Sequence, residues 1–321
     1  MSGAARGLGA YLGQAGRFLS RTLVEPPLPL VAVEVRPRAV AVVRLAREGG
    51  RLALGAAASV ELPEGALAVS LTKPNVLDAE EFRATLRSAL ERAGALSGGP
   101  VSLVLPDPVV RLTLLPSGGV RGRRSENEEV VRFRLHKTLP PDFDVRTARL
   151  AWQPVGGEQL LVAAAADEVV RGYEEALEAL GFHAGLVEPA GLALASLDGA
   201  GKGGDRLLVN WDEGYVSFFL SRGGQPLLLR TLPRESSRES VARQAAQTLR
   251  FHRDHLGGRD LEEVVLRAAA MPADEATSVL ADALGIVPRL LRPWSALGVA
   301  EDGAAAQAVA AAAACVLRRA A

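Results

Sequence analysis

Val31-Ala-Val-Glu-Val-Arg-Pro37, followed after Arg38 by Ala39-Val-Ala-Val-Val-Arg-Leu45, is the stretch that decides the fold. Two runs of β-branched and apolar residues flank a short turn that contains a proline, a pattern that predicts a β-hairpin. Residues 51–62 have the composition of a third strand. The sequence therefore predicts a three-stranded meander near the start of the chain.

The same pattern returns in the second half of the chain, after a glycine-rich boundary at residues 198–205. In each half the meander is followed by helices and by a further strand, which predicts two similar α/β units with a cleft between them. The expected strands of the second half are 206–210, 215–220, 226–232, 263–268 and the short 287–291. The main helices are expected at 78–93, 126–138, 167–180 and 235–256, with Asp78 and Asp167 as the caps of the first and the third.

Composition narrows the classes of function. The 321 residues carry 37 basic and 37 acidic side chains, so the overall charge that favours nucleic-acid binding is missing, and we expect no nucleic-acid partner. The longest uncharged run, 303–317, is shorter than a membrane-spanning helix needs and predicts a C-terminal helix instead. The single cysteine, Cys315, lies in this run and is expected to pack in the core.

Residues 1–24 carry Arg6, Arg17 and Arg21 but no acid, and their apolar residues recur at helical spacing. This pattern predicts an amphipathic helix that rests on an anionic membrane surface or on a partner. The alternative is a frayed tail, because four glycines weaken the helix. No apolar core of a signal peptide is present, so export is not expected. A proline-rich linker closes the segment at residue 29.

Several stretches, in order, resemble the PilM family of type IV pilus assembly proteins, which have an actin-like ATPase fold. Besides Val31–Pro37, they include Leu103-Val-Leu-Pro-Asp107, Arg132-Phe-Arg-Leu-His-Lys-Thr-Leu-Pro140 and Arg243-Gln-Ala-Ala-Gln-Thr-Leu-Arg-Phe-His252. The resemblance covers residues 28–319. It implies an α/β protein of two related domains, each with two subdomains. The expected parts are an N-terminal segment 1–29, a first domain 30–108 and 189–203, an inserted subdomain 109–188, a second domain 204–238 and 264–321, and an outer subdomain 239–263.

Nucleotide chemistry in this fold needs glycine-rich phosphate turns, acidic residues for Mg²⁺ and a Gly-Gly pair for the nucleoside. This sequence departs from all three requirements, and Pro37 lacks an N–H to offer a phosphate. We therefore expect a degenerate nucleotide cleft, no bound cofactor and no enzymatic activity. The residues expected to line the cleft are Glu34, Arg36, Asn210, Asp212, Gly214 and Arg267.

The resemblance also implies a cytoplasmic adaptor at the inner face of the inner membrane, in a machine for pilus functions such as twitching motility. Such proteins hold the N-terminal cytoplasmic peptide of a PilN-like membrane protein in a groove beside the inserted subdomain, near the pilus motor ATPases. Candidate groove residues, taken from the matching motifs, are Leu105, Asp107, Arg134 and Lys137.

Three alternatives stay open at this point: an actin-like ATPase that still binds ATP, a type II secretion platform subunit resembling GspL, and a division protein resembling FtsA. His252 and His255, three residues apart on one expected helix, have a metal-binding spacing but no third ligand, and we expect them on the exposed helix surface. Arginines around 111–134 form a basic cluster that either meets an acidic peptide or lipid headgroup or is a solvated loop.

Overall fold

The computed structural model describes residues 29–120, 124–156, 158–197, 203–258, 260–297, 299 and 303–317. The predicted amphipathic segment 1–24 and most of its linker lie outside the described residues, as do Arg121 and Arg123 of the basic cluster. Within the described part of the chain, no helix combines the length and apolarity that a membrane crossing requires.

The first sheet contains five strands in the order β3-β2-β1-β4-β8. The strands β1 (Val31–Arg36), β2 (Ala39–Glu48) and β3 (Arg51–Glu61) form the predicted antiparallel meander, while β4 (Gly99–Leu105) and β8 (Phe182–Pro189) continue it in parallel. β1 lies in the middle and is buried on both faces, which explains its nearly unbroken apolar sequence.

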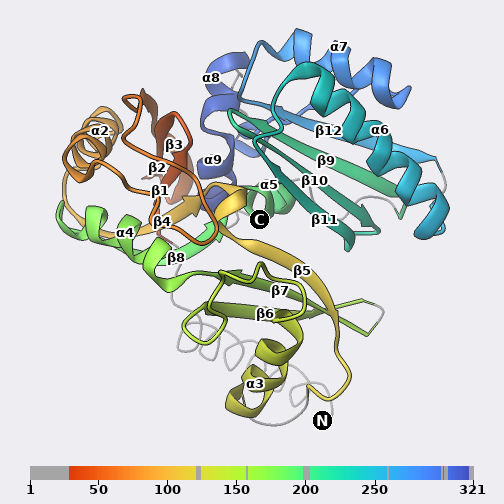
Figure 1. Cartoon of the computed structure of the whole chain (residues 1–321). Coiled ribbons are helices and arrows are strands. Elements are labelled where there is room, and N and C mark those ends of the chain that lie inside the picture. The colour runs from red at the N-terminus through yellow and green to blue at the C-terminus, as the bar shows by residue number, and fades with distance from the viewer. Residues whose placement is uncertain are drawn as a thin grey trace, which may run out of the picture.

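The second sheet repeats this topology, in the order β11-β10-β9-β12-β13. Its strands are β9 (Asp205–Asp212), β10 (Tyr215–Arg222), β11 (Gln225–Pro233), β12 (Leu261–Ala268) and the short β13 (Arg289–Leu290). Again two hairpins precede parallel pairing of the central strand, β9 with β12. Figure 1 shows the two sheets as separate halves of the molecule.

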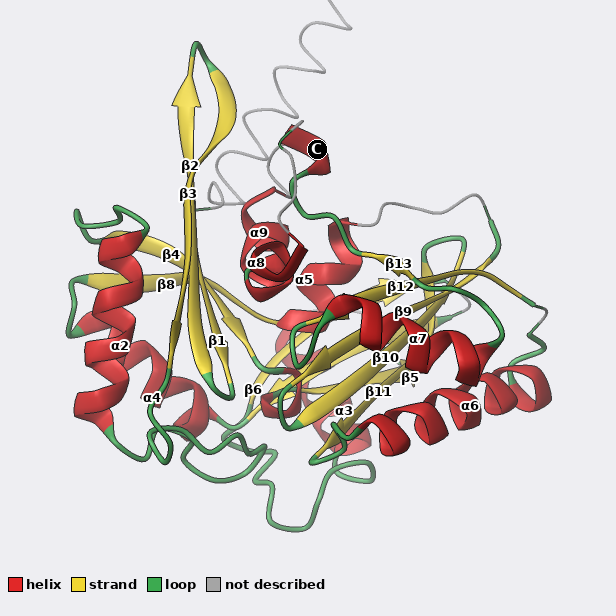
Figure 2. Cartoon of the chain, turned by 90° about the horizontal axis from the view of Figure 1, so that it is seen from above, coloured by secondary structure: helices red, strands yellow, loops and turns green. Residues whose placement is uncertain are grey.

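Helices cover both faces of each sheet (Figure 2). α2 (Ala79–Arg92) and α4 (Asp167–Glu178) cover the outer face of the first sheet, and α6 (Arg238–His255) and α7 (Ala273–Leu284) cover the outer face of the second. Asp78 caps α2 as predicted, by accepting hydrogen bonds from the backbone N–H of Glu80 and Glu81. The predicted cap at Asp167 is wrong: it is the first residue of α4, and its side chain pairs with Arg149.

Between β4 and β8 the chain forms a smaller unit with its own core, at the bottom of Figure 1. A turn of 3-10 helix, η1 (Asp107–Val109), leads into β5 (Arg111–Pro116), α3 (Arg124–Leu135), β6 (Arg149–Val155) and β7 (Gln159–Ala165). These strands pair antiparallel in the order β5-β7-β6. We call this unit the inserted subdomain.

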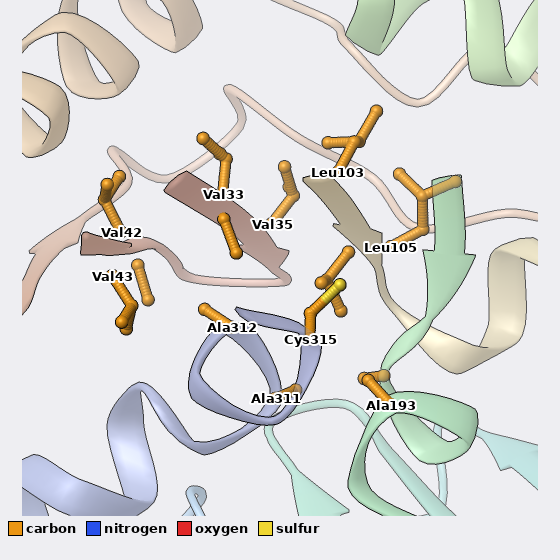
Figure 3. Close-up of a cluster of buried hydrophobic side chains, with 14 of the residues drawn as sticks. Val33, Val35, Val42, Val43, Leu103, Leu105, Ala193, Ala311, Ala312 and Cys315 are labelled. Atoms are coloured by element: carbon orange, nitrogen blue, oxygen red, sulfur yellow. The ribbon is translucent and has the colours of Figure 1, made fainter. Parts of the chain in front are cut away.

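The C-terminal residues return to the first sheet. After η2 (Ser295–Leu297), α8 (Gly303–Ala308) and α9 (Ala310–Leu317) form the predicted C-terminal helix with an interruption at Val309. The sequence predicts that 264–321 belongs to the second domain, but α9 packs against β1, β2 and β4 of the first sheet and beside α5 (Ala190–Leu197). Cys315 is fully buried there, as predicted, among valines and leucines of the first sheet (Figure 3).

Candidate functional site

The first hairpin turns of the two halves face each other across the junction of the two domains. Arg36 is the last residue of β1, and Asp212 is the last residue of β9. The Asp212 carboxylate accepts a bidentate pair of hydrogen bonds from Arg36, at 2.8 Å from Nη2 to Oδ1 and 3.0 Å from Nε to Oδ2. Arg36 Nη2 also donates to the carbonyl oxygen of Ala269, 2.9 Å away. Both ion-paired side chains are buried, so this charge-assisted pair of hydrogen bonds connects the two domains away from bulk solvent.

Arg267, on β12, is the centre of the cluster. Its Nη2 donates to Glu34 Oε1 at 2.6 Å, and its Nη1 donates to Asp212 Oδ2 and Asn210 Oδ1, each at 3.1 Å. Its Nε donates to the carbonyl oxygen of Gln307 at 3.1 Å. The side chain has no exposed surface. Since a buried charge is costly unless it is paired and hydrogen-bonded, the four acceptors are what permits an arginine at this position.

The helices at the C-terminus complete the cluster. Glu34 Oε2 accepts a hydrogen bond of 3.1 Å from the backbone N–H of Ala312, one of the amides that the first turn of α9 leaves without a partner within the helix. The Gln307 side chain accepts from the Ala268 N–H at 3.1 Å and donates to the Leu291 carbonyl at 2.7 Å. The first domain, the second domain and the C-terminal helices thus share one hydrogen-bonded network.

Asp107 joins the same junction from η1. Its Oδ1 accepts a 2.6 Å hydrogen bond from the N–H of Gly191, and its Oδ2 accepts one of 2.9 Å from Asn210 Nδ2. A glycine is required at 191, because a Cβ there would lie 2.1 Å from Phe219 Cζ. Side-chain packing and hydrogen bonding therefore fill this part of the junction.

The pKa values of the two carboxyl groups in the cluster are set by burial and by the two guanidinium groups. Burial alone would raise the pKa of Asp212, but the combined attraction of Arg36 and Arg267 outweighs burial and holds the pKa of this carboxyl below its ordinary value. Burial raises the pKa of Glu34, and the two arginines offset only part of this effect. Asp212 is therefore the firmly ionised partner of both arginines.

The residues at this junction do not fit a magnesium nucleotide. Arg36 ends the strand before the first turn and Pro37 begins that turn, where the fold's chemistry needs free backbone N–H groups. In the second turn, the N–H of Glu213 donates to Asp212 Oδ1 at 2.8 Å instead of facing outward. Gly214 has a φ of 75°, so the glycine serves the turn itself. Five of the six predicted cleft residues form the ion network, and Gly214 lies in the turn beside it.

A groove separates the first sheet from the inserted subdomain. It contains a cavity of about 180 Å³ between the ends of β4 and β8 and the strands β6 and β7. β6 is an outer strand of its sheet, and among the described residues it pairs only with β7. The lining is mainly apolar, with two charged residues: Leu105, Val110, Leu150, Ala163, Val170 and Val187, with Arg149 and Glu188.

A second and larger cavity, of about 510 Å³, lies towards the other end of β6. It is bounded by the end of β6, by α5 and by β9, β10 and β11. The side chain of Gln225, the first residue of β11, accepts a 2.6 Å hydrogen bond from the Gly156 N–H, so the second domain touches the inserted subdomain at this cavity. β6 thus borders one cavity with its first half and another with its second half.

The four candidate groove residues do not come together. Leu105 lines the smaller cavity, whereas Asp107 belongs to the buried junction. Arg134 and Lys137 lie at the end of α3 and do not line that cavity. Arg134 donates to the carbonyl oxygens of Pro116 and Gly118, and the Lys137 ammonium lies 5.4 Å from the Phe133 ring centroid.

Sequence reasoning missed a second buried charged group, at the far end of β9. The Nε2 atom of His252 lies 2.6 Å from Asp205 Oδ2, and Arg222 pairs with the same carboxylate. The predicted exposure of His252 is wrong, because its ring is fully buried, while His255 stacks near Phe251. Among the described residues, no group of three or more metal-ligating side chains is present. The partner of His252, Asp205 on β9, is 47 residues away in the sequence, so no local sequence pattern could indicate this buried pair.

The duplicated five-stranded sheets, the shared strand order and the paired turns at the junction define the class of this protein: it has the actin-like ATPase fold predicted from the sequence. The chain matches no protein-family model, and no curated protein is similar to it in sequence.

Among solved structures, the chain is similar to a chain of the PilM–PilN type IV pilus biogenesis complex. The TM-score is 0.74 at 22% identity, over 92% of this chain and 99% of that chain. This likeness shows that the fold is the PilM-like form of the actin-like architecture. More distant similarities are to the cytoplasmic domain of EpsL from the Vibrio cholerae type II secretion system (TM-score 0.47, 12% identity, 75% of this chain and 83% of that chain) and to a Bacteroides thetaiotaomicron protein with an actin-like ATPase fold (TM-score 0.49, 10% identity, 81% and 88%).

Proposed function

We propose that this protein is a PilM-like adaptor of a type IV pilus assembly machine, which binds the cytoplasmic N-terminal peptide of a PilN-like inner-membrane protein. The likeness extends over nearly the full length of both chains. It supports a role in type IV pilus assembly, because the compared chain comes from the PilM–PilN complex. In this proposal the protein works at the cytoplasmic face of the inner membrane, near the motor ATPases, and residues 1–24 add a peripheral membrane contact.

The observation that carries the proposal is the groove beside β6. An extended peptide adds to a sheet through main-chain hydrogen bonds at an open strand edge, while pockets take its alternate side chains. β6 has such an edge, and the apolar cavity lined by Leu105, Leu150 and Val187 lies next to its first half. A short apolar segment fits this surface better than a charged one, because Arg149 is already paired with Asp167 and Glu174.

The proposed adaptor needs no nucleotide. The ion network at the domain junction supports this part of the proposal, since the groups that would hold phosphate and metal are bonded to one another. The proposed role is therefore assembly by binding, without catalysis.

The test is a tagged pull-down from detergent-solubilised host membranes, read by mass spectrometry, with three variants of the full chain. Ala151→Glu places a charge on an exposed residue that lines the smaller cavity. Gln153→Glu is the matched control, because it is exposed on the same strand but lines the larger cavity. We expect Ala151→Glu to lose a single-span membrane protein that the native chain and Gln153→Glu enrich.

Lys137→Glu tests whether the basic end of α3 contributes to the partner site, as the sequence motifs predicted. If Gln153→Glu alone loses the partner, the larger cavity is the binding site and the groove assignment fails. If no membrane protein is enriched by the native chain, the adaptor proposal itself fails.

A further inference from the structure

Four oxygen atoms converge on the guanidinium group of Arg267. They belong to two carboxylates, a side-chain amide and a backbone carbonyl: Glu34 Oε1, Asp212 Oδ2, Asn210 Oδ1 and Gln307 O, all within 2.6–3.1 Å of an Arg267 nitrogen. Carboxylates, amide oxygens and backbone carbonyls are the donor set that proteins use for Mg²⁺ and Ca²⁺. Here the same set surrounds a side-chain cation that has no exposed surface.

The four acceptors come from separate parts of the fold. Glu34 lies on β1 of the first domain, Asn210 and Asp212 lie on β9 of the second, and Gln307 lies on α8. A positive charge at their centre thus connects both domains and the C-terminal helices. With Arg36 on the other side of Asp212, two guanidinium groups balance two carboxylates. Within this ion-paired set no charge is left for a metal ion to neutralise, while the third carboxyl of the junction, Asp107, is held by hydrogen bonds from Gly191 and Asn210.

We propose that Arg267 is a built-in cation: it supplies permanently, from the chain itself, the charge and the cross-domain ligation that a bound divalent cation would supply between these residues. The proposal concerns the domain junction and holds whichever partner fills the groove beside β6. Removing the guanidinium uncovers an oxygen-lined space that a divalent cation can enter together with water ligands, because the oxygens surround a group larger than a bare ion and metal–oxygen bonds are only about 2.0–2.6 Å long.

The test is Arg267→Ala in the full chain, with thermal unfolding measured in EDTA and in about 5 mM MgCl₂, CaCl₂ or MnCl₂. In EDTA we expect the variant to unfold about 6 °C or more below the native chain, because two buried carboxylates lose their shared partner. At least one of the three cations should then raise its Tm by about 3 °C or more, and should move the native Tm by less than about 1 °C. Manganese binding, followed by electron paramagnetic resonance, should show one ion more per variant chain than per native chain.

Arg206→Ala is the matched control. Arg206 is a largely buried arginine paired with Glu263 at 2.5 Å, away from the junction, so its removal should create no cation response. A second variant, Glu34→Gln with Arg267→Ala, restores the balance of one positive and one negative charge. It should unfold at a higher temperature than Arg267→Ala in EDTA and should lose the response to cations.

If Arg267→Ala is insoluble, its refolding yield in EDTA against that in CaCl₂ replaces the melting experiment, and the yield should rise severalfold with the cation. The proposal is overturned if no cation and no guanidinium ion at about 10 mM improves the stability or yield of Arg267→Ala beyond the effect on Arg206→Ala. It is also overturned if the double variant responds to cations as strongly as the single variant does.

Discussion

Arg36 and Asp212 occupy the same position in the two halves of the fold and pair with each other. Each is the last residue of the central strand of its sheet and is followed by a two-residue turn, since Arg36 pairs with Ala39 and Asp212 with Tyr215. They are 176 residues apart, and their bidentate ion pair has a contact of 2.8 Å. The ends of the two central strands thus contact each other directly across the junction of the domains.

Breaking this pair should destabilise the protein strongly. Arg36→Met leaves Asp212 buried with one cation instead of two, and loss of one partner from a buried pair costs about 3–5 kcal/mol. Urea unfolding of Arg36→Met, Asp212→Asn and the double variant should give a coupling energy above about 1 kcal/mol. Arg38→Met is the control, because Arg38 is half-exposed and 4.0 Å from Glu64, and it should change stability by less than about 0.5 kcal/mol. Additive single variants would contradict the pairing.

The protein should not bind ATP. Entry of a triphosphate between the turns would require Arg36 to leave Asp212 and the Glu213 N–H to be released. Isothermal titration of the purified chain with Mg-ATP should therefore show no heat of binding up to about 1 mM, a limit that corresponds to about −4 kcal/mol. Micromolar affinity that Asp212→Ala abolishes would restore the reading as an ATPase with an altered cleft.

Asp205, which is buried at the start of β9 beside His252, should make the free energy of unfolding depend on pH in the acidic range. The hydrogen bonds from Arg222, with that to His252, outweigh the effect of burial and lower the pKa of Asp205 to about 2. Because the folded pKa lies below the unfolded value, Asp205 stabilises the folded state above about pH 4, and this contribution is lost as the pH falls towards 2.

Asp205→Asn should thus lower the free energy of unfolding by about 2 kcal/mol at pH 7, and the difference should shrink between about pH 4 and pH 2. Urea titrations across this range provide the measurement. Asp260→Asn serves as the control, because Asp260 is almost fully exposed and lies 3.4 Å from Arg253. A difference between Asp205→Asn and the native chain that stays constant from pH 7 to pH 2 would contradict the assignment.

Gly191 should tolerate no side chain. An alanine Cβ at this position would lie 2.1 Å from the Phe219 ring, so α5 and β10 must separate. Gly191→Ala should cost about 1–3 kcal/mol or more in urea unfolding, as other overpacked sites do. Adding Phe219→Leu should recover part of the loss. If the two changes are simply additive, the contact between α5 and β10 is not what requires the glycine.

Local patterns were enough to predict the architecture. The hairpin 31–45, the cap at Asp78 and the buried Cys315 follow from residue type and spacing, and the structure has all three. The order of such elements also led to the actin-like fold, which the likeness to the PilM–PilN chain shows. These features are set by neighbours in sequence, where the physical rules of turns, caps and periodicity apply.

The side-chain contacts at the junction of the two domains could not be predicted from such local rules. The sequence placed Arg36 and Arg267 among the residues of a degenerate cleft, but Arg267 and its partner Glu34 are 233 residues apart. Only the tertiary structure shows that these two opposite charges meet and neutralise each other. Gln307 was visible as the polar residue in an alanine run, yet its role depends on where α8 lies against β12. The buried His252 was missed for the same reason.

The last helix completes the core of a domain whose first strand begins almost 280 residues earlier. Residues 310–317 are buried against β1, β2 and β4, and Ala312 donates to Glu34 from the opposite end of the chain. During synthesis on the ribosome, the first sheet therefore emerges long before the helix that covers its inner face. The order of translation therefore differs from the order in which this core can close, because the first sheet is complete only after α9 has been made and packs against it.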